Sequence, residues 1–240
     1  MKYLKFGSSK KYMIFLHGWG ASKESFLMTK NYFFDYVKVY VDFAGFGESD
    51  QPSKVFSLSD YVEEVKKLLD KFDIEELVIV GHSFGGRVAI KLASLYQSKY
   101  QNFKLVLVDS AGIKPRFSLV KFLKVRRYKR LKKRAESNER LKEKLERCGS
   151  ADYRKLSPLM KRVFVKIVNE DLSPISKLIS CKTLIVWGKD DKETRLYMAK
   201  ILHKNIAGSR LEIIKNAGHF CFLDKPQDFL IILDTFIKNE

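Results

Sequence analysis

The segment Val78-Ile79-Val80-Gly81-His82-Ser83-Phe84-Gly85-Gly86 runs from an apolar, strand-like stretch through Gly-x-Ser-x-Gly into a helical pattern. A serine held in a sharp turn between a strand and a helix takes strained backbone angles, so small residues are needed two positions to either side. Gly81 and Gly85 supply them. We therefore expect Ser83 to project from this turn as a nucleophile.

A serine hydroxyl reacts only when a base removes its proton, and the base must be held in one tautomer by a further group. Two later strand-like runs end in suitable residues. Thr183–Trp187 opens into Gly188-Lys189-Asp190-Asp191, and Leu211–Ile214 leads to Asn216-Ala217-Gly218-His219. The chain order is therefore serine, aspartate, histidine, and we expect the three side chains to meet at the carboxyl edge of a sheet.

Two further motifs accompany this constellation, His17-Gly18-Trp19-Gly20 and the segment Asp42-Phe43-Ala44-Gly45-Phe46-Gly47-Glu48-Ser49. With them the chain resembles, over nearly its whole length, the serine hydrolases of the α/β-hydrolase fold, whose triad partners follow the Gly-x-Ser-x-Gly turn in this order. The resemblance implies a mostly parallel central sheet flanked by helices.

The resemblance also implies roles for the individual residues. Ser83 is expected to be the nucleophile, and His219 the general base and then the general acid. In the family the acid usually lies three residues after the strand-ending glycine, which favours Asp191 over Asp190. Asp109, after the strand-like run Leu105–Val108, is a third candidate, and the polar segment Lys192-Glu193-Thr194 departs from the family pattern.

An oxyanion hole needs two backbone N–H donors directed at the charge that develops on the substrate carbonyl oxygen. By the same resemblance we expect the N–H groups of Phe84 and Trp19 to serve. Their side chains are then free to line the acyl pocket, which we expect to be small and to favour short to medium acyl chains.

Short apolar strands alternate with amphipathic helices along the chain, the pattern of an α/β protein with a sheet covered on both faces. One strand is expected before the run at Met13. The pattern predicts strands at 12–16, 37–42, 77–81, 104–109, 183–187 and 210–214, and helices at 58–72, 84–96 and 226–237.

Between Gly112 and Ser180 this alternation stops, which divides the chain into a core of residues 1–112 and 181–240 and a helical cap of residues 113–180. Relatives carry a cap at this position that closes over the active site. The cap is strongly basic: Lys114 to Arg147 holds 15 Lys and Arg against 4 Glu, or +11 of the whole chain's +18.

The basic cap has several interpretations. It can simply be a solvated face that keeps the protein in solution. The His-Gly-Trp-Gly loop is similar to that of biotin-pathway esterases, and this resemblance implies docking of an acidic acyl carrier protein on basic cap residues such as Arg126, Arg127, Arg130 and Arg134. The clustered charge can also attract anionic lipid headgroups. No nucleic acid partner is expected, because no nucleic-acid-binding motif accompanies the charge.

Composition sets further limits. A chain of 240 residues with 45% hydrophobic content can bury one core and carry an insertion. Three irregularly spaced cysteines favour a reduced compartment over a disulfide framework, so a cytoplasmic location is expected. No apolar run approaches the ~18 residues of a membrane span.

These observations predict hydrolysis of a carboxylic ester, or a thioester, through an acyl-enzyme, with no metal or organic cofactor. Alternatives on the same machinery are an acyl-carrier-protein-linked ester hydrolase, a C–C bond hydrolase and a lipid hydrolase. A catalytically silent ligand-binding receptor of the same fold is the non-enzyme alternative.

Overall fold

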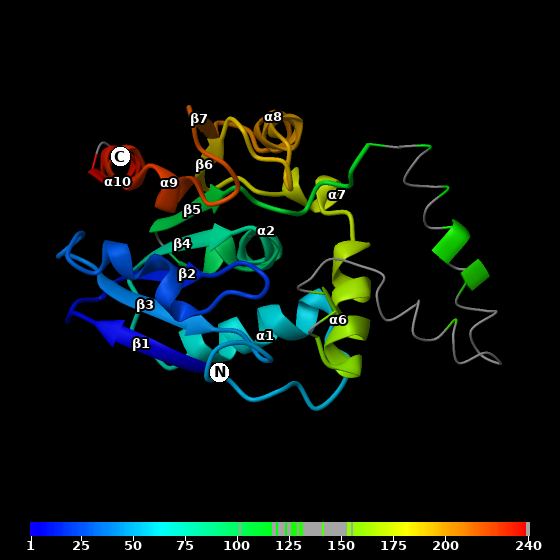
Figure 1. The fold of residues 1–240 in the computed structure, drawn as a ribbon. Helices are drawn as coiled ribbons and strands as arrows, with labels where there is room; N and C mark the ends of the chain where they lie inside the picture. The colour runs from blue at the N-terminus through cyan, green and yellow to red at the C-terminus, as the bar shows by residue number, and fades with distance from the viewer. Residues whose placement is uncertain are drawn as a thin grey trace.

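The computed structural model describes residues 1–100, 102–116 and 156–238, and between them residues 119, 123, 126–128, 130, 131, 141, 153 and 154. Within these residues, seven strands form one sheet in the order β1-β3-β2-β4-β5-β6-β7 (Figure 1). β1 is antiparallel to β3 and the other neighbours are parallel. The strands are β1 (Lys2–Phe6), β2 (Lys11–Leu16), β3 (Val37–Asp42), β4 (Glu76–His82), β5 (Asn102–Val108), β6 (Lys182–Gly188) and β7 (Arg210–Ile214).

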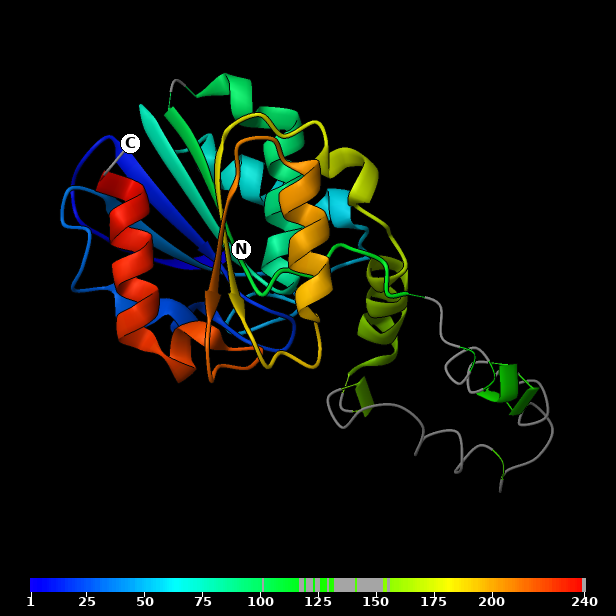
Figure 2. The same cartoon turned by 90° about the horizontal axis from the view of Figure 1, so that it is seen from above.

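Helices cover both faces of the sheet, which is why the central strands read as nearly continuous apolar runs. α1, α2 and α8 pack on one face and α10 on the other, as Figure 2 shows from above. The helices are η1 (Lys23–Thr29), α1 (Leu58–Leu69), α2 (Phe84–Tyr96), η2 (Gln97–Lys99), α6 (Pro158–Val168), α7 (Ser173–Ser176), α8 (Leu196–Asn205), α9 (Cys221–Asp224) and α10 (Pro226–Lys238).

The predicted α/β class and the mostly parallel sheet are confirmed, and each predicted strand agrees with an observed one to within two residues. The helix predicted to reach Phe72 ends earlier, at Leu69. Beyond it the backbone N–H groups of Lys71 and Phe72 bond to the carbonyls three residues before them, so the chain tightens into turns. Phe72 still contributes to packing, because its ring stacks on Tyr12.

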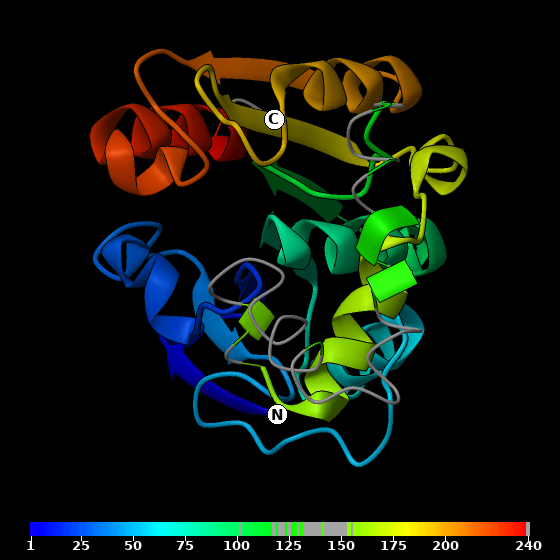
Figure 3. The same ribbon diagram turned by 45° about the vertical axis from the view of Figure 1, so that its right-hand side comes forward.

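In sequence, α6 and α7 come between β5 and β6, inside the segment predicted to form the cap. α6 lies next to α1, on the side of the sheet that α1 and α2 cover (Figures 1 and 3). Arg126, Arg127 and Arg130 are exposed, and Arg134 lies outside the described residues. The boundaries of the cap at 113 and 180 stay a prediction.

In the part of the chain that the structure describes, no helix has the length and apolar character needed to cross a bilayer. Cys181 and Cys221 are free thiols, and Cys148 lies outside the described residues.

Candidate active site

Ser83 lies in the turn between β4 and α2 with φ 48° and ψ −108°, a conformation that costs a non-glycine residue free energy. The neighbouring strand end holds it there. Its N–H donates to the carbonyl of Val108 at 3.1 Å, and its carbonyl accepts from the N–H of Ala111 at 3.0 Å. A Cβ at Gly85 would lie 2.1 Å from the carbonyl oxygen of Leu16, so only glycine lets α2 start this close to β2.

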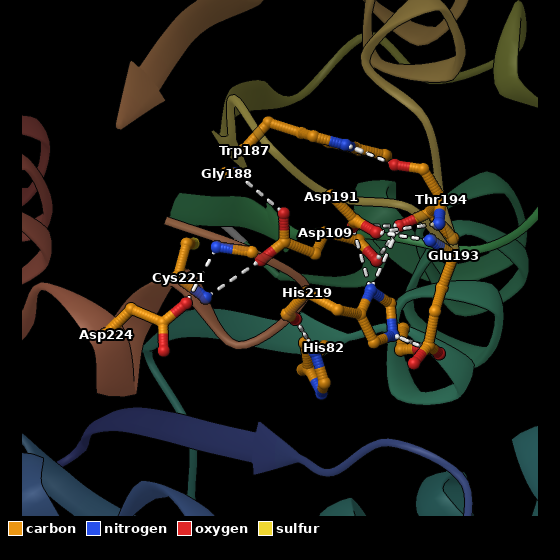
Figure 4. Close-up of polar contacts among 12 residues, drawn as sticks. His82, Asp109, Trp187, Gly188, Asp191, Glu193, Thr194, His219, Cys221 and Asp224 are labelled. Atoms are coloured by element: carbon orange, nitrogen blue, oxygen red, sulfur yellow. Dashed lines mark hydrogen bonds and ion pairs between the residues drawn. The ribbon is translucent and has the colours of Figure 1, made fainter. Parts of the chain in front are cut away.

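His219 joins the serine to a carboxylate. Its Nε2 lies 3.0 Å from Oγ of Ser83, and its Nδ1 lies 2.8 Å from Oδ2 of Asp191. The three residues follow β4, β6 and β7, and the carboxyl ends of these parallel strands meet at one edge of the sheet. Figure 4 shows the imidazole of His219 directed at the carboxylate of Asp191.

The structure separates the three aspartates that the sequence left open. Asp191 is buried and contacts His219, whereas Asp190 is exposed and has neither a hydrogen bond nor an ion pair to it. Asp109 is fully buried, but its carboxylate accepts from the backbone N–H groups of Gly188 at 2.8 Å and Cys221 at 3.2 Å. Of these three carboxylates, only that of Asp191 is hydrogen-bonded to the imidazole.

Thr194, which the sequence did not identify, holds Asp191 in place. Oδ1 of Asp191 accepts from the backbone N–H groups of Glu193 at 2.7 Å and Thr194 at 2.9 Å, and Oδ2 accepts from the Thr194 hydroxyl at 2.6 Å. Burial by itself would raise the pKa of Asp191. The hydrogen bonds from His219 and Thr194 outweigh burial and hold this pKa below its ordinary value, so Asp191 is a carboxylate at neutral pH.

The pKa of His219 is also set by opposing effects. Burial would lower it, but the hydrogen bond and charge of Asp191, with the charges of Glu193 and Asp109, raise it above the ordinary value. Oε2 of Glu193 lies 3.4 Å from Nε2 of His219, on the side of the ring that faces Ser83. The imidazole is therefore stabilised as a cation from both of its nitrogens.

The other two histidines near the site bond to the backbone. His82 is buried, and its Nε2 lies 2.7 Å from the carbonyl oxygen of His219, an acceptor that calls for an N–H at this nitrogen. Burial lowers the pKa of His82 to about 3, so this ring is neutral. Nδ1 of His17 lies 2.7 Å from the carbonyl oxygen of Gly18, and its Nε2 accepts from the N–H of Phe43. Both rings support the loops around Ser83.

A pocket of about 290 Å³ opens at Ser83 and His219. Among the described residues, the backbone N–H groups of Trp19 and Phe84 have no acceptor, and both residues line this pocket beside the serine. Phe84 is the first residue of α2, and an unpaired N–H group at the start of a helix suits an anion. The described apolar and aromatic side chains of the wall are Trp19, Phe84, Ala111, Tyr153, Phe164, Ile167, Val168 and Phe220.

Arg87 is a second residue that the sequence did not identify. It lies one turn after Ser83 in α2, is 6% exposed and lines the pocket. Its guanidinium donates to the carbonyls of Glu170 at 2.8 Å and Val168 at 3.4 Å, at the C-terminal end of α6. A cation at a helix C-terminus is favourable, so Arg87 fastens α6 to α2, the helix that begins directly after Ser83.

Within the described residues, no group of three or more His, Cys, Asp or Glu side chains is arranged to hold a metal ion.

Comparison with known families agrees with this geometry. Residues 13–231 match the model of a family described as the alpha/beta hydrolase family. The chain belongs to this family. The α/β-hydrolase fold expected from the resemblance of its motifs is thereby shown, and the protein is an α/β-hydrolase enzyme.

Relatives of this α/β-hydrolase include a proline iminopeptidase of Saccharolobus solfataricus, 27% identical, with 96% of this chain and 86% of the relative covered. A monoacylglycerol lipase of Mus musculus is 24% identical, with 96% of this chain and 76% of the relative covered. Among solved structures, an esterase from Exiguobacterium antarcticum superposes with a TM-score of 0.74 at 25% identity, covering 98% of this chain and 94% of that chain.

Proposed function

We propose that this α/β-hydrolase cleaves carboxylic esters, thioesters included, through a Ser-His-Asp triad of Ser83, His219 and Asp191. The observation that carries the proposal is the position of His219, 3.0 Å from the hydroxyl of Ser83 and 2.8 Å from the carboxylate of Asp191. A hydroxyl, a base and an orienting carboxylate in this arrangement activate a nucleophile on several unrelated folds.

In the first half of the cycle, Oγ of Ser83 attacks the carbonyl carbon while its proton passes to Nε2 of His219. The carbonyl oxygen becomes an oxyanion, which the N–H groups of Trp19 and Phe84 stabilise. The tetrahedral intermediate then collapses, and the departing alkoxide, or the thiolate of a thioester, takes the proton from Nε2. An alcohol or a thiol leaves and Ser83 remains acylated.

In the second half, His219 removes a proton from water, which attacks the acyl carbon through a second tetrahedral intermediate. Ser83 leaves with the proton from Nε2, and the carboxylic acid is released. Asp191 stays ionised and stabilises the imidazolium at both stages. The lowered pKa of Asp191 supports this role.

The test is covalent labelling with a fluorophosphonate probe, followed by intact-mass analysis. We expect the wild type and Ser94→Ala to gain one adduct, and Ser83→Ala to gain none. Ser94 is the matched control because it lies on α2, the helix that Ser83 precedes, and its hydroxyl donates to the carbonyl of Lys91. Absence of labelling in the wild type would favour the silent receptor over the enzyme.

For the substrate, we infer short to medium acyl chains. A pocket of about 290 Å³ lies near the lower end of the ~300 to 1,000 Å³ typical of small-molecule sites, and aromatic rings form much of its described wall. A panel of p-nitrophenyl esters from acetate to palmitate measures the preference directly. We expect the highest kcat/KM between butyrate and octanoate, and a palmitate optimum would contradict the inference.

The basic cap suggests a carrier for the acyl group. We propose that an acidic acyl carrier protein, or an anionic lipid surface, docks on Arg126, Arg127, Arg130 and Arg134, of which the first three are exposed. Reversing the four to Glu should weaken action on carrier-bound or vesicle-bound esters and leave small p-nitrophenyl esters unaffected. Equal loss on both kinds of substrate would count against docking.

A cytoplasmic location stays a prediction.

A further inference from the structure

Glu193 is an acidic side chain at the open side of the site whose carboxylate reaches the reacting nitrogen of the histidine. Its Oε2 lies 3.4 Å from Nε2 of His219, the atom that also faces Oγ of Ser83 at 3.0 Å. Its side chain is 70% exposed and lines the pocket. In Figure 4 it extends along the imidazole from the loop that carries Asp191.

The position of Glu193 is constrained by its neighbours. Its backbone N–H donates to Oδ1 of Asp191 at 2.7 Å, so the residue is tied to the carboxylate on the opposite side of the ring. In the described part of the chain, its own carboxylate forms no ion pair with a lysine or arginine. The carboxylate of Glu193 faces the imidazole of His219 instead.

We propose that Glu193 is a second carboxylate for His219, which stabilises the imidazolium from its Nε2 side while Asp191 stabilises it from Nδ1. This inference rests on the proposed function. When Ser83 gives its proton to Nε2, the ring becomes a cation within 3.4 Å of a negative charge, so the charge separation that accompanies attack is favoured.

The same contact carries a cost at low pH. A neutral imidazole is required to accept the proton of Ser83, and Glu193 favours the charged form. The groups that face His219 are Asp191, Asp109 and Glu193, which raise its pKa, and the neutral ring of His82 at a centroid distance of 4.9 Å. Glu193 differs from the other two carboxylates because it is exposed and acts on the reacting nitrogen.

The first experiment needs no substrate. We would titrate the imidazole of His219 by NMR in the wild type, Glu193→Gln and Asp190→Asn, with the signal assigned from its loss in His219→Gln. Glutamine keeps the shape of Glu193 and removes its charge. We expect the pKa of His219 to fall by about half a unit in Glu193→Gln, as an exposed pair allows, and to stay unchanged in Asp190→Asn. Equal pKa values in the wild type and Glu193→Gln would overturn the proposal.

The second experiment follows kcat/KM for p-nitrophenyl butyrate against pH. In Glu193→Gln the acidic limb of the profile should move to lower pH by the same amount as the pKa of His219 measured by NMR. The plateau of kcat/KM at high pH should fall about two- to fivefold because the imidazolium is less stabilised. The difference between the variant and the wild type should shrink in 1 M salt, which screens exposed charges. A plateau equal to that of the wild type would overturn the transition-state role.

The two experiments separate this proposal from the proposed function. If the wild type neither hydrolyses esters nor reacts with the fluorophosphonate probe, the triad assignment fails, while the NMR titration still reports whether Glu193 acts on His219. If the wild type is active and Glu193→Gln behaves like Asp190→Asn in both measurements, only the role of Glu193 is lost.

Discussion

The hydroxyl of Thr194 donates to Oδ2 of Asp191 at 2.6 Å, the same oxygen that lies 2.8 Å from Nδ1 of His219. The carboxylate is therefore held from two directions, with its other oxygen bonded to two backbone N–H groups. The carbonyl of Thr194 in turn accepts from the indole Nε1 of Trp187 at 2.6 Å. Residues a few positions from Asp191 in sequence thus orient its carboxylate.

Thr194→Val should lower kcat/KM for p-nitrophenyl butyrate about tenfold, because a hydrogen bond to a charged group contributes roughly 1.5 kcal/mol or more. Thr235→Val is the matched control, since Thr235 donates to the carbonyl of Ile231 on α10. Steady-state kinetics of the two variants side by side measure the effect, and equal rates would show that Thr194 does not orient Asp191.

Asp191→Asn should reduce kcat by about 10³- to 10⁴-fold, because the neutral amide neither selects the tautomer of His219 nor stabilises its cation. Asp190→Asn should stay within about twofold of the wild type, since Asp190 is exposed and has no bond to His219. Kinetics on the same ester decide between the neighbours. A comparable loss in Asp190→Asn would mean that the loop rearranges in the working enzyme.

Asp109 should make stability depend on pH. Burial raises its pKa to about 7, from an ordinary value of 3.8, against the opposing hydrogen bonds from Cys221 and Gly188. Between these two values the folded state binds more protons at Asp109 than the unfolded state does. The contribution of Asp109 to the free energy of unfolding therefore decreases as pH rises from about 4 to 7.

In Asp109→Asn this contribution is absent. The difference between Tm at pH 8 and Tm at pH 5 should therefore be more positive in Asp109→Asn than in the wild type. Thermal unfolding followed by circular dichroism at both pH values measures it, with the exposed Asp190→Asn as the control. A pH dependence identical in Asp109→Asn and the wild type would mean that Asp109 does not titrate in this range.

Arg87→Met should loosen the attachment of α6 to α2, because it removes both donors to the carbonyls of Val168 and Glu170. We expect faster amide exchange across 158–170 and a free energy of unfolding lower by about 2 kcal/mol. Lys91→Met is the comparison, since Lys91 lies one turn further along α2 and pairs with the carboxylate of Glu170 in a partly exposed contact. We expect a smaller effect there, and equal effects would contradict a special role for Arg87.

Much of the fold could be predicted because local signals agree with one another. Strand-like runs that alternate with amphipathic segments predicted the parallel sheet, and the start of α1 at residue 58 was predicted correctly. In the structure the hydroxyl of Ser57 caps this start by accepting from the N–H of Asp60. The end of α1 was wrong by three residues, since the hydrophobic period continues through Phe72 although the backbone turns. Packing of Phe72 on Tyr12 preserves that period in the absence of a helix.

The residues of the candidate site also divide into those that local sequence signals predicted and those that they did not. Ser83 and His219 could be chosen from the sequence because each follows a recognisable strand within a glycine-containing turn. Thr194, Glu193 and Arg87 carried no such signal. Their importance depends on what they face: an oxygen of Asp191, a nitrogen of His219 and the end of a helix that begins 71 positions after Arg87 along the chain, at Pro158.

The order of chemistry along the chain, and the glycines that let a strand turn sharply into a helix, were legible in the amino-acid sequence because they depend on residues close together in the chain. The selection of Asp191 over Asp190 and Asp109 rested on a family pattern until the sheet was assembled. Only tertiary structure could decide which of these carboxylates bonds to His219, because the direction of a side chain at the end of one strand relative to an imidazole at the end of another depends on how β5, β6 and β7 pair.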